Sequence, residues 1–203
     1  MNIDKAIRKQ KKSYKRFLLS MGFIFFVLPA ALVFYKKIHI FYILYLMVLE
    51  LLIILALFIS INNEMLRFNY DGYRLKLILG LGKKRLNLTA NNIVLVHVEN
   101  IDGQENAEED FRIILLSTSK FRSNRMIPVN LVFLRNHPYV AYCYNRIKIL
   151  HPNDQYYFTI IKKGGIKKYP LLDTIYKTCV YAYFTEDTIE KIKFYRENSE
   201  YYN

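Results

Sequence analysis

Two long apolar runs follow one another near the start of this chain. They cover residues 17–35 and 38–61 and are separated only by Lys36 and Lys37. A helix rises about 1.5 Å per residue, so each run is long enough to cross a hydrocarbon core of about 30 Å. The pattern therefore predicts a transmembrane hairpin of two helices, which makes the chain a membrane protein.

After this hairpin the pattern changes to short apolar runs that suit strands. Runs at 66–70 and 73–79 flank Asp71 and Gly72, a pair that favours a tight hairpin turn, so these two strands should pair antiparallel. Other strand candidates are separated by Asn, Pro or Gly residues or by an acidic loop: 84–88, 93–98, 111–117, 126–134, 139–144, 146–150 and 156–161.

Near the carboxyl end the apolar period becomes three and four residues. Residues 170–183 form one such stretch, and Pro170 suits its first helical turn. A second helix should begin after Thr185, whose hydroxyl can accept a backbone hydrogen bond as the cap, and end near Asn198. We therefore expect an α+β protein, with an antiparallel-sheet domain at 62–203 that has helices at its carboxyl end.

Positive charge gathers before the first apolar run. This basic tail, residues 1–16, contains one acid and seven basic residues, which are Lys5, Arg8, Lys9, Lys11, Lys12, Lys15 and Arg16. Cytoplasmic flanks of membrane helices carry an excess of Lys and Arg, so the amino terminus is expected in the cytoplasm. The two crossings at 17–61 return the chain there. The sequence thus predicts a multi-pass protein of the cell membrane with both termini cytoplasmic.

A cleavable signal peptide is the alternative explanation of the first apolar run. Its basic region would be 5–16 and its apolar region 17–28, with a poor cleavage site at Pro29, Ala30 and Ala31. The run continues beyond these residues without the small-residue pattern of a cleavage site, which favours a membrane helix. Both alternatives leave the following domain in the cytoplasm.

The formal net charge of the chain is +13, and it is concentrated beside the membrane. Basic residues near a bilayer attract anionic lipid by about 1 kcal/mol each, so the tail is expected to bind anionic membrane lipid, and no nucleic-acid partner is expected. A protein partner or a second copy of the chain should associate through the membrane helices. Cys143 and Cys179 are far apart in the sequence, so they are expected to be ordinary core residues and not part of a disulfide framework.

One part of the chain resembles a known family. Residues 67–76 are Arg-Phe-Asn-Tyr-Asp-Gly-Tyr-Arg-Leu-Lys, and residues 82–93 are Gly-Lys-Lys-Arg-Leu-Asn-Leu-Thr-Ala-Asn-Asn-Ile. The chain is similar to bacterial membrane proteins with a pleckstrin-homology-like (PH-like) domain. The shared features are a strand pair, a basic turn, a short strand that enters a helix-like turn, and a strand with an Ile-x-x-Val pattern. The resemblance implies a PH-like fold and a binding or scaffolding role at the cytoplasmic membrane face. An additional helix and the segment 139–170 exceed a minimal domain of this kind.

The sequence contains no motif that indicates catalysis, a cofactor or a metal. The stretch from Gly80 to Lys84 lacks the glycine and the Ser or Thr that a Walker A phosphate loop needs, so it is expected to be a turn. The four histidines never stand at metal-ligand spacing. The acidic group at 105–110 has the composition of a solvated loop. We therefore expect no enzymatic activity and no cofactor.

Glu50 is a candidate site because it lies in the middle of the second apolar run, where a charged carboxylate is costly. A structural interpretation makes it a neutral carboxyl that is hydrogen-bonded to a neighbouring helix. A functional interpretation makes it a proton or ion relay, or a contact with a membrane helix of a partner.

Basic residues at predicted strand ends form a second candidate surface. They would hold anionic headgroups or a partner if the turns converge on the membrane side, and they would be solvated loop tips if the turns scatter. These residues are Lys83, Lys84, Arg85, Lys120, Arg122, Arg125, Lys162, Lys163, Lys167 and Lys168.

Three functions are compatible with these patterns. The first is a non-enzymatic, membrane-tethered binding or scaffolding module that recruits a protein or anionic-lipid partner. The second is an accessory subunit of a transport or secretion complex in the membrane, in which Glu50 would lie against a foreign helix. The third is an enzyme at the membrane face, which would need a pocket where acids or histidines converge.

Overall fold

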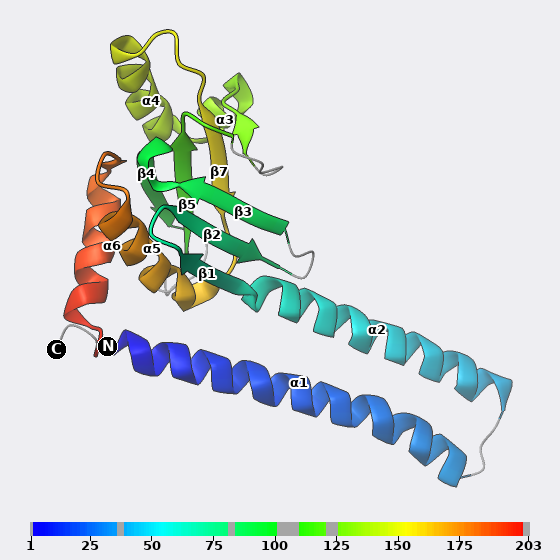
Figure 1. The fold of residues 1–203 in the computed structure, drawn as a ribbon. Coiled ribbons are helices and arrows are strands. Elements are labelled where there is room, and N and C mark those ends of the chain that lie inside the picture. Colours follow the sequence, from blue (N-terminus) through cyan, green and yellow to red (C-terminus); the bar gives the residue numbers. More distant parts are fainter. Residues whose placement is uncertain (1, 36–38, 81–83, 101–109, 121–125, 201–203) are drawn as a thin grey trace.

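In the computed structural model the described residues are 2–35, 39–80, 84–100, 110–120 and 126–200. Two long helices, α1 (Ile3–Phe34) and α2 (Ile40–Glu64), leave a mixed α+β domain side by side (Figure 1). Each contains an apolar window long enough to cross a membrane, and no part of either window is buried inside the structure. The prediction of two long apolar helices is confirmed.

Helix α1 begins at Ile3, so the basic segment expected as a separate tail is the first part of the same helix. The Asn2 side chain caps the helix by accepting a hydrogen bond from the backbone N–H of Lys5 at 3.0 Å. No glycine or proline interrupts residues 3–21. The basic segment is therefore helical, and its first turn reaches the interior of the domain, where Ile3 is fully buried.

The first three strands form an antiparallel sheet and are β1 (Leu66–Tyr70), β2 (Arg74–Leu79) and β3 (Lys84–Thr89). The predicted antiparallel hairpin between β1 and β2 is confirmed, because Tyr70 pairs with Leu75 across it. Tyr73, expected at the start of the second strand, lies in the turn, since β2 begins at Arg74. Within the turn the Asp71 carboxylate accepts two backbone hydrogen bonds, and Gly72 has a φ of 89°. Strand β3 then enters a 3₁₀ turn, η1 (Ala90–Asn92), where the family resemblance implied a helix-like turn.

A second sheet has the strand order β6-β7-β5-β4-β8. Its pairs are antiparallel, except that β8 runs parallel to β4. The strands are β4 (Ile93–Asn100), β5 (Phe111–Ser117), β6 (Ile127–Pro128), β7 (Tyr157–Ile161) and β8 (Tyr183–Phe184). The strands predicted at 93–98, 111–117 and 156–161 are confirmed, and β8 has no counterpart among the predicted strands.

The region between β6 and β7 is helical, and the strands predicted there are wrong. Helix α3 (Leu131–Asn136) replaces the end of the strand expected at 126–134, of which β6 keeps Ile127 and Pro128. Helix α4 (Pro138–Leu150) replaces the strands expected at 139–144 and 146–150. Aromatic and β-branched residues favoured strands locally, but apolar side chains three and four residues apart pack on the sheet as a helix. The Asn130 side chain also caps α3, at 2.8 Å from the backbone nitrogen of Phe133.

Both predicted carboxyl-terminal helices are present, and the first has different bounds. Helix α5 (Lys168–Thr178) follows the 3₁₀ turn η2 (Gly165–Lys167) and ends before the predicted residue 183, because the chain must extend to form β8 beside β4. Helix α6 (Glu186–Glu197) matches the second predicted helix. Thr185 occupies its cap position, but the hydroxyl makes no capping hydrogen bond, contrary to the prediction.

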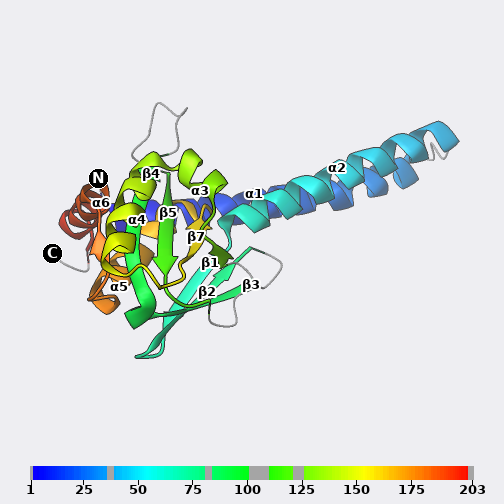
Figure 2. The same ribbon diagram turned by 90° about the horizontal axis from the view of Figure 1, so that it is seen from above.

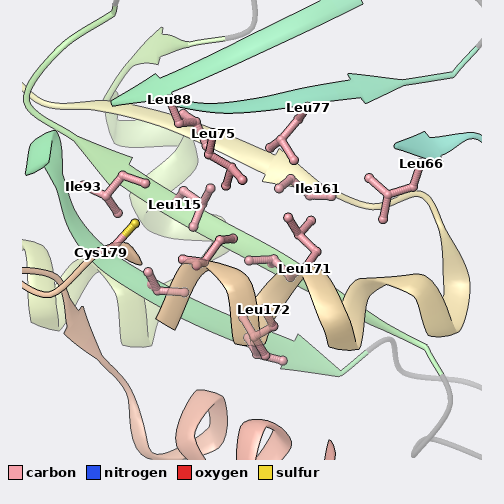
Figure 3. Packing of buried hydrophobic residues seen from close by; sticks show 14 of the residues in the cluster. Leu66, Leu75, Leu77, Leu88, Ile93, Leu115, Ile161, Leu171, Leu172 and Cys179 are labelled. Atoms are coloured by element: carbon pink, nitrogen blue, oxygen red, sulfur yellow. The ribbon is translucent and has the colours of Figure 1, made fainter. Parts of the chain in front are cut away.

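Hydrophobic cores lie on both faces of the five-stranded sheet. The larger core fills the space between the two sheets and α5 and α6, and it contains Leu75 and Leu115 (Figure 3) as well as Ile3 of α1. The smaller core, which includes Leu95 and Val140, lies under α3 and α4. Figure 1 places α3 and α4 on the side of the domain away from α1, and in Figure 2 they lie in front of the five-stranded sheet.

Candidate functional site

The first part of α1 has one face in the domain and one face in solvent. Ile3 and Ile7 pack in the larger core, and Gln10 and Tyr14 continue this face toward the apolar run. All seven predicted basic residues of the tail are exposed on the remaining surface: Lys5, Arg8, Lys9, Lys11, Lys12, Lys15 and Arg16. Of these, Arg8 lies 3.1 Å from Glu200, which ties it to the end of the chain. A basic helical face therefore adjoins the apolar run at a fixed position.

The two long helices meet the domain at a polar junction. The Gln10 amide donates a hydrogen bond to the Glu64 carboxylate at 2.7 Å, which links α1 to the last turn of α2. Lys167 donates to the same carboxylate at 3.2 Å and to the Glu64 backbone carbonyl at 3.1 Å. A small cavity of about 160 Å³ lies beside these groups and is also lined by Tyr14 and Arg67. The junction thus joins α1, α2 and η2 through side chains that lie far apart in the sequence.

Two glycines let the loop between β7 and η2 approach this junction. Gly164 has a φ of 111°, and its backbone N–H donates to the carbonyl of Asn63 at 3.1 Å. A Cβ at Gly164 would overlap the Leu66 side chain, and a Cβ at Gly165 would overlap the Gln10 amide. Glycine is required at both positions because the loop backbone lies directly against the start of β1 and against α1.

The structure brings part of the predicted basic surface together. Lys162 is exposed, and Lys163 lies beside Gly80 at the end of β2, near the start of β3 where Arg85 is exposed. Lys120 is exposed beyond β5, at the opposite end of β7 from Lys162. Lys84 belongs to β3. Lys167 belongs to the junction with Glu64. Lys83, Arg122 and Arg125 lie outside the described residues.

Lys168 is in the interior of the domain and not on that surface. Its side chain is fully buried, and its ammonium donates hydrogen bonds to the Asp110 carboxylate and to the carbonyl of Phe111. Burial lowers the pKa of Lys168, although Asp110 opposes this effect. Lys168 therefore anchors the start of α5 to the beginning of β5, and it is unavailable for a headgroup or a partner.

Glu50 lies half-buried on the face of α2 that is turned toward α1. Half-buried positions on this face recur at Leu46, Glu50, Ile53 and Leu57, which is helical spacing. Within the described parts of the two helices, no hydrogen bond or ion pair involves Glu50. The described part of the hairpin therefore provides no polar partner for this carboxyl.

A polar cluster that was not apparent from the sequence lies at one end of the five-stranded sheet. His97 and Glu99 of β4 meet His137 at the start of α4, and the Glu99 carboxylate lies 2.6 Å from Nδ1 of His137. Side chains alternate between the two faces of a strand, so His97 and Glu99 lie on the same face of β4. This alternation was the only sign of the cluster that the sequence offered. The contact with His137 depended on α4, which was predicted as strand. None of the described residues form a group of three or more His, Cys, Asp or Glu side chains that could hold a metal ion.

Comparison of the chain with protein-family models, with curated proteins and with solved structures finds no match. A functional assignment therefore rests on the geometry of the chain itself.

Proposed function

We propose that this protein is a two-helix membrane protein whose α+β domain is a non-enzymatic binding or scaffolding module at the cytoplasmic face of the cell membrane. The observation that carries this proposal is the continuity of α1, which runs from the buried Ile3 through the basic face into the apolar run. A domain attached in this way is held at a set distance from the bilayer and cannot move on a loose tether.

The basic face of α1 supports an anionic-lipid partner. Lys12, Lys15 and Arg16 lie within about 8 Å of residue 17 along the helix axis, given a rise of about 1.5 Å per residue. This is close to the Debye length of about 8 Å at physiological ionic strength, so their attraction to headgroups is only partly screened. Lys5 lies about 18 Å away by the same arithmetic and is largely screened. Residues 12–16 should therefore supply most of the attraction.

The arrangement of β1, β2, β3, η1 and β4 supports a PH-like domain, because it has the strand order and the helix-like turn that the resemblance implies. Such a domain would bind a partner through its surface. The exposed Arg85 and Lys162 and the neighbouring Lys163 are the candidate contact residues for an acidic partner at the membrane-proximal end.

An accessory subunit of a membrane complex is the second candidate function, and Glu50 favours it. A carboxyl without a partner in its own hairpin is costly in a bilayer, and a polar group on another helix would remove this cost. The outer faces of α1 and α2 are apolar and exposed, with Phe23, Phe26 and Leu51 each more than 60% exposed. They offer the area for contact with a foreign helix or with a second copy.

A test of the leading proposal uses the full chain in phosphatidylcholine vesicles that contain spin-labelled phosphatidylglycerol or spin-labelled phosphatidylcholine. We expect the chain to immobilise the anionic label more than the neutral one, and we expect high salt to remove the difference. Replacement of Lys12, Lys15 and Arg16 by Gln should abolish most of this selectivity. Replacement of Arg135, Arg146 and Lys193 by Gln, which removes equal charge from α3, α4 and α6, is the control. Equal selectivity in both triple variants would contradict the proposal.

A further inference from the structure

The face of the five-stranded sheet under α3 and α4 changes from apolar to polar along its strands. On β4 the side chains on this face are Leu95, His97 and Glu99, and the register places Leu116, Ile114 and Arg112 of β5 opposite them. Leu95, Ile114 and Leu116 belong to the smaller core. At the polar end the sheet and the start of α4 border a cavity of about 520 Å³, which is also lined by Asn136, Tyr139 and Asp187.

The tautomer of His97 follows from a chain of hydrogen bonds at the back of this cavity. The Thr188 hydroxyl donates to the carbonyl of Val96, which can only accept. Thr188 must therefore accept from the Thr185 hydroxyl at 2.9 Å, and Thr185 must in turn accept from Nδ1 of His97 at 3.0 Å. This leaves Nε2 of His97 as an unprotonated acceptor in a neutral ring. Burial lowers the pKa of His97 and favours the same neutral form.

Beside this acceptor stands a carboxylate whose position is also set. Glu99 is held by Nδ1 of His137 at 2.6 Å, and its Oε1 lies 3.9 Å from Nε2 of His97. Two acceptors at this separation do not bond to each other, but one ammonium group between them could donate to both. Asp187 adds a second carboxylate to the cavity lining.

The neighbouring guanidinium is not used to neutralise Glu99. Arg112 is the direct cross-strand partner of Glu99, yet Glu99 pairs with His137. Among the described residues, the buried Nε of Arg112 has no hydrogen-bond partner. Adjacent strands lie about 4.8 Å apart, so Glu99 and Arg112 place opposite charges at neighbouring positions of the cavity lining.

We propose that this cavity binds a small zwitterion of the α-amino acid type, with its ammonium between Nε2 of His97 and Glu99 and its carboxylate on Arg112. Tyr139 stacks on the His97 ring, with ring centroids 5.1 Å apart, and closes one side of the site. The cavity volume exceeds that of the ammonium and carboxylate alone and leaves space for a side chain. The inference is independent of the lipid and scaffolding role, since it concerns the end of the sheet and not the helical hairpin.

The test measures heats of binding when the common L-α-amino acids are titrated one by one, at millimolar concentration, into the detergent-purified full chain. At least one should bind. For the tightest, the carboxamide, which lacks the negative charge, and the N-acetyl derivative, which lacks the positive charge, should each bind at least about tenfold more weakly, because each loses a charge-assisted hydrogen bond. Absence of binding by every amino acid, or full affinity of either derivative, would overturn the proposal.

Variants locate the site on the chain. Arg112→Gln and Glu99→Gln should each weaken binding at least about tenfold, since each removes one charged partner. Arg146→Gln and Glu190→Gln remove the same charges from exposed positions on α4 and α6 and should bind as the unchanged chain does. Circular dichroism confirms that each variant is folded, and the ligand derivatives test the charges without any substitution. Unchanged affinity in both folded cavity variants would refute the assignment.

Discussion

The backbone N–H of Ile3 donates a hydrogen bond to the carbonyl of Asn198 at 2.9 Å, so the first turn of α1 is bound to the end of α6. The same contact is reinforced by the backbone N–H of Glu200, which donates to the Asp4 carboxylate at 2.7 Å. The beginning and the end of the described chain therefore lie together (Figure 1). A hairpin that crosses a bilayer then has both ends on one side.

We predict that this side is the cytoplasm, because basic residues precede the first crossing. In intact cells an impermeant maleimide should label Lys37→Cys and should not label Asn203→Cys. Cys143 and Cys179 give little background, since both are buried and burial raises the pKa of both thiols. The opposite labelling pattern would show that the domain is external.

Substitution of Glu50 distinguishes a structural carboxyl from a relay. If the carboxyl only donates a neutral hydrogen bond to another helix, Glu50→Gln should retain association and Glu50→Leu should weaken it modestly, since such bonds average about 0.6 kcal/mol in membranes. A proton relay needs a group that releases a proton, and Gln cannot do so. If Glu50 is a relay, Glu50→Gln and Glu50→Leu should therefore impair the cellular function equally. Energy transfer between labelled copies in vesicles and a cellular phenotype, scored for both variants, separate the two outcomes.

The pair of Asp110 and Lys168 should respond asymmetrically to substitution. Lys168→Met removes the buried charge and lets the partly exposed Asp110 rehydrate, so we expect a loss of about 1.5–3 kcal/mol of unfolding free energy. Asp110→Asn leaves the ammonium buried without a carboxylate and should cost more at neutral pH. Thermal unfolding of the full chain in detergent checks the order. A smaller loss for Asp110→Asn would mean that the backbone carbonyls of Phe111 and Lys162 satisfy Lys168 without the carboxylate.

Gly164→Ala should destabilise the junction between the long helices and the domain. A residue with a side chain is strained at this positive φ by about 1–3 kcal/mol, and overlap with Leu66 adds about 1–3 kcal/mol. Gly72→Ala is the matched control, because Gly72 also has a positive φ but its Cβ would meet open space. Unfolding midpoints should fall further for Gly164→Ala. Equal shifts would indicate that Leu66 moves aside without cost.

The stability of the chain should fall as the pH decreases below about 6.5, the ordinary histidine pKa, because of His97. Above this pH His97 is neutral in both the folded and the unfolded chain, so it contributes no slope. Below it, the unfolded chain binds a proton that the folded chain excludes, which costs up to about 1.4 kcal/mol per pH unit until the lowered folded pKa is passed.

Unfolding midpoints measured across this pH range check the effect of His97. His97→Gln should flatten the dependence, and His151→Gln, at an exposed position, should leave it unchanged. A dependence that persists in folded His97→Gln would assign the slope to other groups.

The sequence by itself determined the elements whose signals are local. The two apolar helices follow from uninterrupted runs of one composition, and the β1–β2 hairpin follows from Asp71 and Gly72, whose own preferences specify the turn. Helix α6 follows from its spacing and from the acids after Thr185. In each case the residues that specify the element lie within that element, so contacts with other parts of the chain did not alter its secondary structure.

Only the tertiary structure decided the remaining features. Helix α4 has a strand-like composition and is helical because Val140 and Cys143 pack against the sheet. The position of the basic segment against the domain was set by Ile3, which enters a core built by residues much later in the chain. The contact of Glu99 with His137 spans 38 residues and depends on the register of β4 against β5 and on the position of α4. Such contacts are set by packing between elements, and no local pattern of residues contains that information.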